Sequence, residues 1–255
     1  YKLGITSLFI IITISLFGLL FGRLIFEKKI KILSNKITNK SQFIFISDVH
    51  LGTNSILHLK KILDKIKNMQ YDFILIGGDL IDSSSFDLSE LSILKKQISK
   101  PIYFVTGNHE YYVENYKEKL IQLNQFGIIT LNNSNINIGN INLIGLDDRQ
   151  SSKDQFNKYL ELQDKNKYNI LLVHKPSIWD NVKDKTDLML SGHCHNGQIM
   201  PFNLLVRFQF KYIYGLFNHN NSKLYISSGS ACWGPRIRVG TFNEIIHIEL
   251  NIKNN

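Results

Sequence analysis

The chain has 255 residues, of which 44% are hydrophobic and 20% charged, so it can bury one sizeable core and is short for two. Ordinary glycine, proline and aromatic contents argue against a disordered or collagen-like protein, and two cysteines, Cys194 and Cys232, exclude a disulfide scaffold and a cysteine-built zinc site. Seven basic residues and one acidic residue lie in residues 1–40, so the net charge of +9 is concentrated there, and the nearly balanced remainder disfavours nucleic-acid binding.

The first 26 residues are predicted to form a transmembrane anchor. Leu3–Gly22 is uncharged and rich in Leu, Ile and Phe, and a helix of that length spans roughly 30 Å, the hydrocarbon thickness of a bilayer. A cleaved signal peptide is the alternative, but the run is longer than a usual signal core and Ala231 is the sole alanine, so no A-x-A site exists.

Basic residues on the C-terminal side of this helix predict its orientation. Six of the seven basic residues follow the apolar run, so the positive-inside rule predicts a single-pass protein whose main domain lies on the cytoplasmic face. We interpret residues 27–40 as a basic juxtamembrane linker that holds the domain close to anionic headgroups.

From Ser41 onward, short apolar runs alternate with amphipathic stretches. Buried strands are predicted at residues 42–47, 71–76, 102–105, 170–173 and 188–190, and helices at 54–69, 87–99 and 113–126. A hairpin at 136–146 and later strands at 223–227 and 244–250 add antiparallel pairs. The pattern predicts an α/β domain over residues 41–255, with two packed mixed sheets flanked by helices.

Each of the five expected buried strands ends in a polar motif. The motifs are Ser47-Asp48-Val49-His50, Gly77-Gly78-Asp79, Gly107-Asn108-His109-Glu110, His174-Lys175-Pro176 and Gly192-His193-Cys194-His195. Open α/β sheets build their sites just beyond the carboxyl ends of their strands, and oxygen and nitrogen ligands of these types suit Mn, Fe, Zn or Mg. A single His or Asp after a strand is commonly a cap or turn residue, but five such motifs together indicate a metal site.

The blocks DVH, GGD, GNHE, VH and GHCH, in this order over Asp48–His195, resemble the calcineurin-like metallophosphoesterases. The apolar N-terminal helix, GNHEYY, GHCHNGQI and the tail SSGSACWGPRIRVG are similar to the membrane-associated branch that contains YkuE-like and YaeI-like phosphoesterases. The resemblance covers nearly all of the chain after the anchor. It implies the αββα sandwich of that family, two divalent metal ions and a hydrolase acting on phosphoester or pyrophosphate bonds.

The resemblance also implies a role for each motif residue. One metal ion would be bound by Asp48, His50 and His195, the other by Asn108, His174 and His193, and Asp79 would bridge them. Such a pair of cations can hold a shared hydroxide for in-line attack on phosphorus. His109 would stay off the metals as general acid or hydrogen-bond donor to the phosphoryl group, and Asp48 would orient its ring.

Several other polar residues have two interpretations. Cys194 stands where the family usually has Thr, and we expect it to be a small packed residue rather than a soft ligand. Asp82 and the pair Asp147-Asp148 are expected to cap or pair rather than bind metal. Candidates for a substrate phosphate are Arg149, Arg236 and Arg238, the alternative being a salt-bridged face.

The aromatic and basic segment Ile199–Phe217 bears on the substrate. It is either ordinary packing around a long loop or an apolar rim that faces the bilayer. The second interpretation favours a lipid-linked phosphoester or pyrophosphate, with UDP-2,3-diacylglucosamine of lipid A synthesis as the lead substrate. The alternatives are a phosphodiesterase acting on soluble or nucleic-acid substrates and a non-catalytic metal-bound scaffold.

Overall fold

The first of two six-stranded sheets carries the N-terminal half of the metal-site motifs. In the computed structural model, which describes residues 1–253, its strand order is β1-β12-β2-β3-β4-β5. These strands are Ile25–Ser34 (β1), Asn243–Ile252 (β12), Ser41–Ile46 (β2), Phe73–Ile76 (β3), Ile102–Phe104 (β4) and Ile128–Thr130 (β5). Strands β2 to β5 run parallel, β12 is antiparallel to β2, and β1 runs parallel to β12.

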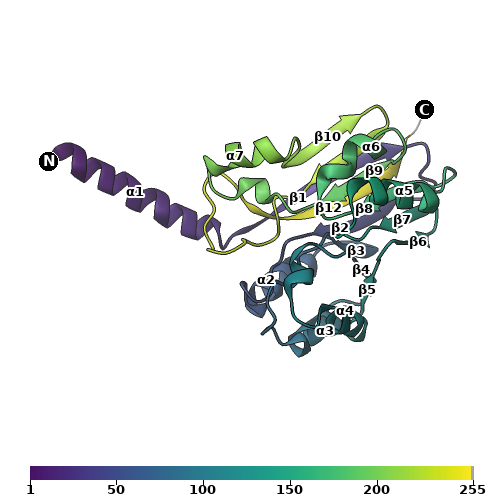
Figure 1. Ribbon diagram of the computed structural model, residues 1–255, viewed down its shortest axis with the longest axis horizontal. Helices are drawn as coiled ribbons and strands as arrows, with labels where there is room; N and C mark the ends of the chain where they lie inside the picture. Colours follow the sequence, from purple (N-terminus) through teal and green to yellow (C-terminus); the bar gives the residue numbers. More distant parts are fainter. Residues whose placement is uncertain (254–255) are drawn as a thin grey trace.

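The second sheet carries the later motifs and has the order β10-β11-β9-β8-β7-β6. Its strands are Gly215–His219 (β10), Ser222–Ile226 (β11), Leu188–Ser191 (β9), Tyr168–Leu172 (β8), Ile141–Gly145 (β7) and Ser134–Ile138 (β6). The inner strands are parallel and the two edge strands antiparallel, so both sheets are mixed. The predicted fold class is confirmed (Figure 1).

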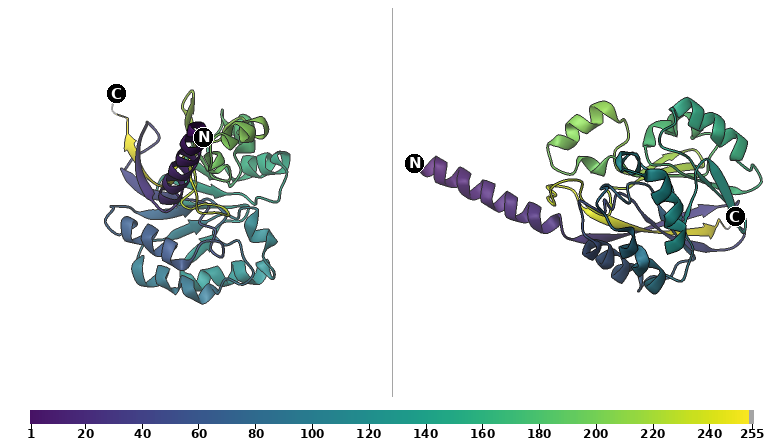
Figure 2. Two further views of the ribbon diagram at one scale, coloured as in Figure 1. Left: turned by 90° about the vertical axis from the view of Figure 1, so that its left-hand side faces the viewer. Right: turned by 60° about the horizontal axis from the view of Figure 1, so that its bottom comes forward.

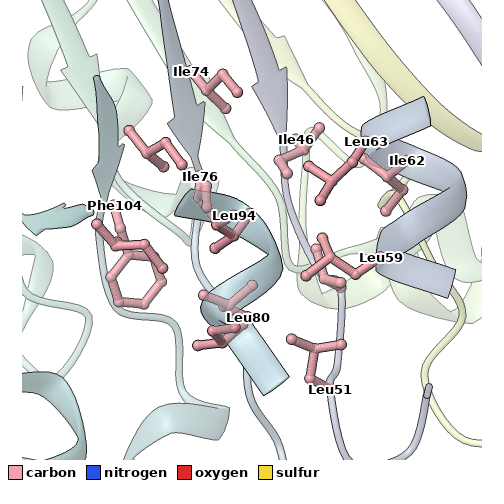
Figure 3. Close-up of a cluster of buried hydrophobic side chains, with 14 of the residues drawn as sticks. Ile46, Leu51, Leu59, Ile62, Leu63, Ile74, Ile76, Leu80, Leu94 and Phe104 are labelled. Carbon is pink, nitrogen blue, oxygen red and sulfur yellow. The ribbon is translucent and has the colours of Figure 1, made fainter. Parts of the chain in front are cut away.

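Three apolar layers hold the sheets and helices together. Side chains from both sheets, including Phe43, Phe73, Leu143 and Ile170, form the layer between them. On the outer face of the first sheet, residues such as Ile46 and Ile76 pack against helix α2 (Ile56–Ile66) and helix α3 (Ser92–Gln97), as Figure 3 shows. Burial of apolar surface on both faces explains why these strands are continuous hydrophobic runs in the sequence.

Other helices complete the outer layers. Helix α5 (Ser152–Leu162), the short helix η4 (Pro176–Ile178) and α6 (Trp179–Val182) cover the second sheet. On the side of the first sheet lie η1 (Leu88–Leu91), η2 (His109–Tyr112), α4 (Tyr116–Leu123) and η3 (Asn124–Phe126). Two further helices are η5 (His195–Gly197) and α7 (Phe202–Gln209). The predicted helices at 54–69, 87–99 and 113–126 therefore exist, the last two each in two short pieces.

Helix α1 (Lys2–Phe21) projects from the domain, as Figures 1 and 2 show. It has a mean hydropathy of 2.4, only 6% of its most apolar window is buried, and by length and composition it can cross a membrane. Residues 27–40, expected to be a linker, lie largely in the structured domain instead, because β1 pairs along its whole length with β12. Ile30 and Ile32 of β1 are buried between the sheets, and Lys28 on the same face packs against the ring of Tyr225. Lys29 and Lys31 are exposed, as in a charged edge strand.

Candidate metal centre

The carboxyl ends of β2, β3, β4, β8 and β9 bring the predicted ligands together, as expected for parallel strands. Five of the seven predicted ligands have backbone φ angles in the left-handed region: Asp48, His50, Asp79, His193 and His195. For residues other than glycine this conformation costs about 1–3 kcal/mol and persists where the surrounding structure enforces it, often at functional sites. The strained turns direct these side chains toward one another beyond the strand ends.

The first ligand cluster consists of Asp48, His50 and His195, all of them buried. The Nε2 atoms of His50 and His195 are 3.1 Å apart, and Nε2 of His195 lies 3.4 Å from Oδ1 of Asp48. Oδ2 of Asp79 lies 3.9 Å from Nε2 of His50. The sequence-predicted residues of one metal position therefore converge.

The second cluster consists of Asp79, His174 and His193. Nε2 of His174 is 3.1 Å from Oδ2 of Asp79 and 3.2 Å from Nδ1 of His193. The same Asp79 oxygen thus faces a histidine of each cluster, which is the position required of a bridging carboxylate. Within the described residues, the buried Oδ1 of Asn108 has no hydrogen-bond partner, as expected of an oxygen reserved for a ligand.

The hydrogen bonds of His174 favour a cation at this site. Nδ1 of His174 must donate to the carbonyl oxygen of Gly77 at 2.8 Å, so a neutral ring directs a bare Nε2 lone pair at the Asp79 carboxylate. Burial lowers the pKa of His174, but the Asp79 carboxylate outweighs it and raises that pKa to about 10. Nε2 of His174 faces both the Asp79 carboxylate and Nδ1 of His193. One proton can relieve the repulsion at only one of these contacts, whereas a divalent ion can bind all three side chains together. The residues present therefore fit two metal ions.

Glu110 positions the bridging carboxylate, a role that the sequence analysis did not assign. Its buried carboxylate accepts backbone N–H bonds from Asp79 at 3.0 Å, Leu80 at 2.7 Å, Ile81 at 3.0 Å and Gly107 at 2.7 Å. A Cβ at Gly107 would collide with the Asp79 carboxylate, so this position requires glycine. The only signal in the sequence was an acid directly after the GNH triplet.

Asp82 lies outside the seven predicted ligands and contacts one of them, His50. Its Oδ2 lies 3.3 Å from Nδ1 of His50, and its Oδ1 accepts the backbone N–H of Thr53 at 2.8 Å. A carboxylate behind a ligating histidine fixes the ring and directs the other nitrogen toward the metal. Asp82 is thus paired with His50 and Thr53, in line with the expectation that it caps or pairs.

The ring of His109 lies half-buried beside the first ligand cluster. Its centroid is 4.7 Å from that of His50 and 6.2 Å from that of Trp233. Asp48 was expected to orient this ring, but Asp82 is the carboxylate grouped with His109, and Asp48 instead accepts the backbone N–H of His193 at 3.0 Å. Burial lowers the pKa of His109.

Of the three arginines suggested for substrate phosphate, Arg238 has a different role. It is fully buried, and its guanidinium donates to Asn243 Oδ1 at 2.6 Å and to the carbonyl oxygens of His195 at 3.0 Å and Ala231 at 2.9 Å. It therefore braces the loop that carries His195 and presents no face to a substrate. The sequence could not reveal this, because a buried arginine and a phosphate-binding arginine look alike in a motif.

The other two arginines lie nearer the surface. Arg149 forms an ion pair of 3.0 Å with Asp147 and stacks 4.3 Å from the centroid of the Tyr111 ring, so it matches the salt-bridged alternative. Arg236 is half-buried and remains the candidate among the three. Cys194 is buried with its Sγ 3.9 Å from the carbonyl oxygen of Tyr212, as expected for a packed residue.

Comparisons with known proteins agree with this geometry. A family model described as calcineurin-like phosphoesterase matches residues 41–197. An uncharacterized metallophosphoesterase of Helicobacter pylori is 35% identical over 243 residues, which cover 89% of this chain and 64% of that protein. YkoQ, an uncharacterized metallophosphoesterase of Bacillus subtilis, is 32% identical, with 81% of this chain and 82% of that protein covered.

Two further similarities bear on the architecture. A transmembrane protein with a metallophosphoesterase domain from Bos taurus is 29% identical over 83% of this chain and 53% of its own length. A solved crystal structure aligns with a TM-score of 0.50 at 10% identity, covering 75% of this chain and 91% of that chain, which shows the fold alone. The chain spans less than two thirds of the Helicobacter relative, at 64% of its length.

Proposed function

The chain belongs to the calcineurin-like phosphoesterase family, and on that premise we propose that it hydrolyses a phosphoester or pyrophosphate bond with two divalent metal ions. The observation that carries this proposal is the convergence of the two ligand clusters on Asp79. The proposed ligands are Asp48, His50, Asp79, Asn108, His174, His193 and His195.

The metal ions and the protein side chains would have different roles in the reaction. When bound, two ions roughly 3.5–4 Å apart would activate the attacking water and offset charge on the phosphoryl oxygens. His109 would donate a hydrogen bond to the phosphoryl group or the departing oxygen. Because burial lowers its pKa and nearby cations would lower it further, His109 is neutral at neutral pH, which favours hydrogen-bond donation over a cationic acid.

For the substrate we propose a membrane lipid with a phosphate or pyrophosphate headgroup. Helix α1 can cross a bilayer. At the site, the exposed side chains of Trp233 and Tyr112 lie against the ring of His109. The basic residues after α1 support a domain on the cytoplasmic face. UDP-2,3-diacylglucosamine has the required chemistry, with acyl chains and a pyrophosphate, and is one member of this class.

The test uses the full chain in lipid nanodiscs with Mn or Mg. We expect metal-dependent hydrolysis of both an aryl phosphodiester and UDP-diacylglucosamine, and abolition of both by a chelator. Hydrolysis of the aryl phosphodiester alone would favour a soluble-substrate phosphodiesterase. A metal-loaded protein that hydrolyses neither compound, nor a second lipid pyrophosphate, would favour the non-catalytic scaffold.

A further inference from the structure

The junction between α1 and the domain fixes which edge of the domain meets a membrane. The carbonyl oxygen of Gly18 accepts the backbone N–H of Arg238 at 3.0 Å, and that of Gly22 accepts Nδ2 of Asn243 at 3.1 Å. A Cβ at Gly22 would collide with the backbone of Arg236, so the helix end lies directly on this segment. If α1 crosses a bilayer, residues 236–243 therefore lie at its surface.

Helix α7 lies at the same edge of the domain. The backbone N–H of Met200, just before α7, donates to the carbonyl oxygen of Val239 at 2.9 Å, within the segment that meets α1. Figure 1 shows α7 at the end of the domain from which α1 projects, and Figure 2 shows the same arrangement from a second side. The two helices therefore belong to one end of the molecule.

The surface of α7 is unusually apolar for a face in water. Phe208 is 88% exposed, and none of the eight residues of α7 is buried. The other large apolar side chains exposed on or beside it are Met200, Phe202, Leu204, Leu205 and Trp233. Contiguous exposed apolar side chains on a soluble face mark a contact with a protein or a membrane.

Charge and position favour a membrane as the contact. Helix α7 carries Arg207 and no acidic residue, and Arg23 follows α1 at the same end. Apolar side chains interspersed with basic ones suit the boundary between anionic headgroups and acyl chains. A bilayer entered by α1 would already be adjacent to this surface, whereas a protein partner would have to compete for it.

We propose that α7, together with Met200 and Trp233, is an interfacial helix that inserts into the headgroup boundary of the bilayer and seats the metal centre at the lipid surface. Both ends of this surface contact the centre. The ring of Phe210, just after α7, lies 5.1 Å from that of the ligand His193, and Trp233 contacts His109. The effect on lipid hydrolysis rests on the proposed function, but the docking itself does not.

Fluorescence quenching of the full chain in vesicles tests the docking. Phe208→Cys is labelled with a fluorophore, with Ile121→Cys on α4 as the matched control, because Ile121 is 71% exposed and both native cysteines are buried. We expect lipids brominated on their acyl chains to quench the label at position 208, and aqueous iodide to reach it several-fold less than the label at 121. Equal responses at the two positions would overturn the proposal. Shielding from iodide without quenching by lipid would also overturn it, by showing that protein covers α7.

A second variant connects docking to turnover. The double variant Phe202→Ser and Phe208→Ser, checked for folding by circular dichroism, is expected to hydrolyse vesicle-borne substrate at least about tenfold more slowly while retaining its rate on an aryl phosphodiester. Equal effects on the two substrates would contradict seating of the metal centre by α7. Failure of the unmodified chain to hydrolyse any substrate would refute the proposed function alone, and the quenching result would still decide the docking.

Discussion

The proposed function assigns some side chains to metal binding and others to the substrate. Asp79 faces a histidine of each cluster, so its charge serves both metal positions. His109 follows the proposed ligand Asn108 directly, yet its half-buried ring lies beside Trp233. Asn108 is therefore proposed to bind metal and its neighbour His109 to hydrogen-bond the substrate. Substitutions can test this division.

His109→Ala should retain both metal ions but slow turnover. Removal of one preorganised hydrogen-bond donor to developing charge typically costs about 10²–10³-fold, so we expect a decrease in kcat of about 100-fold or more on a substrate with a poor leaving group. Metal content is measured by elemental analysis and activity with an alkyl phosphodiester. Loss of the metals in this variant would show that His109 is a ligand instead.

Metal affinity should increase with pH. Burial lowers the pKa of His174, but the Asp79 carboxylate raises it to about 10, so at neutral pH the metal-free site carries a proton that a metal ion must displace. Apparent affinity for Mn should therefore rise by up to about tenfold per pH unit between pH 6 and 8, with proton release on binding. Titration calorimetry in two buffers of different ionisation enthalpy measures that release. Affinity that does not change with pH would contradict a protonated His174.

The elements that carry the ligands are held by contacts that the motifs alone do not reveal. Four backbone N–H groups between β3 and η2 converge on Glu110, and the loop of His195 rests on the buried Arg238. The convergence of the candidate ligands could be predicted from their motifs, because parallel strands end at one edge and the five blocks occur in the family order. The supporting contacts depend on which side chains three-dimensional packing buries, and sequence spacing does not determine that.

Glu110→Gln should destabilise the fold and weaken metal binding together. An amide replaces one of the two accepting oxygens with a donor, which leaves either the N–H groups of Leu80 and Ile81 or those of Asp79 and Gly107 unsatisfied, at about 1–3 kcal/mol each. We expect the free energy of unfolding of the metal-free protein to fall by about 2 kcal/mol or more. Glu114→Gln, at an exposed position, is the matched control. Equal stability of the two variants would show that the Glu110 hydrogen bonds contribute little.

The interpretation of residues 27–40 as a linker was wrong, because strand β1 occupies much of that segment. Three lysines in Ile25–Ser34 suggested a linker, but Ile30 and Ile32 form the side of an edge strand that is buried between the sheets. Lysines on an edge strand discourage pairing with other chains, so they are compatible with strand structure. The helix α5 and the strand β10 were likewise not predicted, because their apolar faces are narrow and interrupted by polar residues.

At the scale of the whole molecule, the apolar helix and the metal domain are joined without a flexible spacer. Strand β1 starts at Ile25, close after α1 ends at Phe21, and continues into the sheet that contains β2, β3 and β4. The position of the helix relative to the metal centre is thus set by the fold. This short connection also determines where the chain can be shortened.

Shortened chains should differ sharply in stability. Removal of residues 1–20 should leave a folded, metal-binding domain, because β1 and the Gly22 contacts remain. Removal of residues 1–40 deletes β1 and uncovers apolar surface of β12 and the layer between the sheets, so that protein should aggregate or melt at a clearly lower temperature. Thermal unfolding monitored by circular dichroism compares the two. Equal melting temperatures would show that β1 is dispensable.

The central claim is that seven side chains hold two metal ions with Asp79 between them. Anomalous diffraction at the Mn absorption edge, from crystals of the full chain grown with Mn, tests it most directly. We expect two anomalous peaks among these seven side chains, roughly 3.5–4 Å apart, and both within bonding distance of the Asp79 carboxylate. A single peak, or two peaks beyond bonding reach of Asp79, would contradict it.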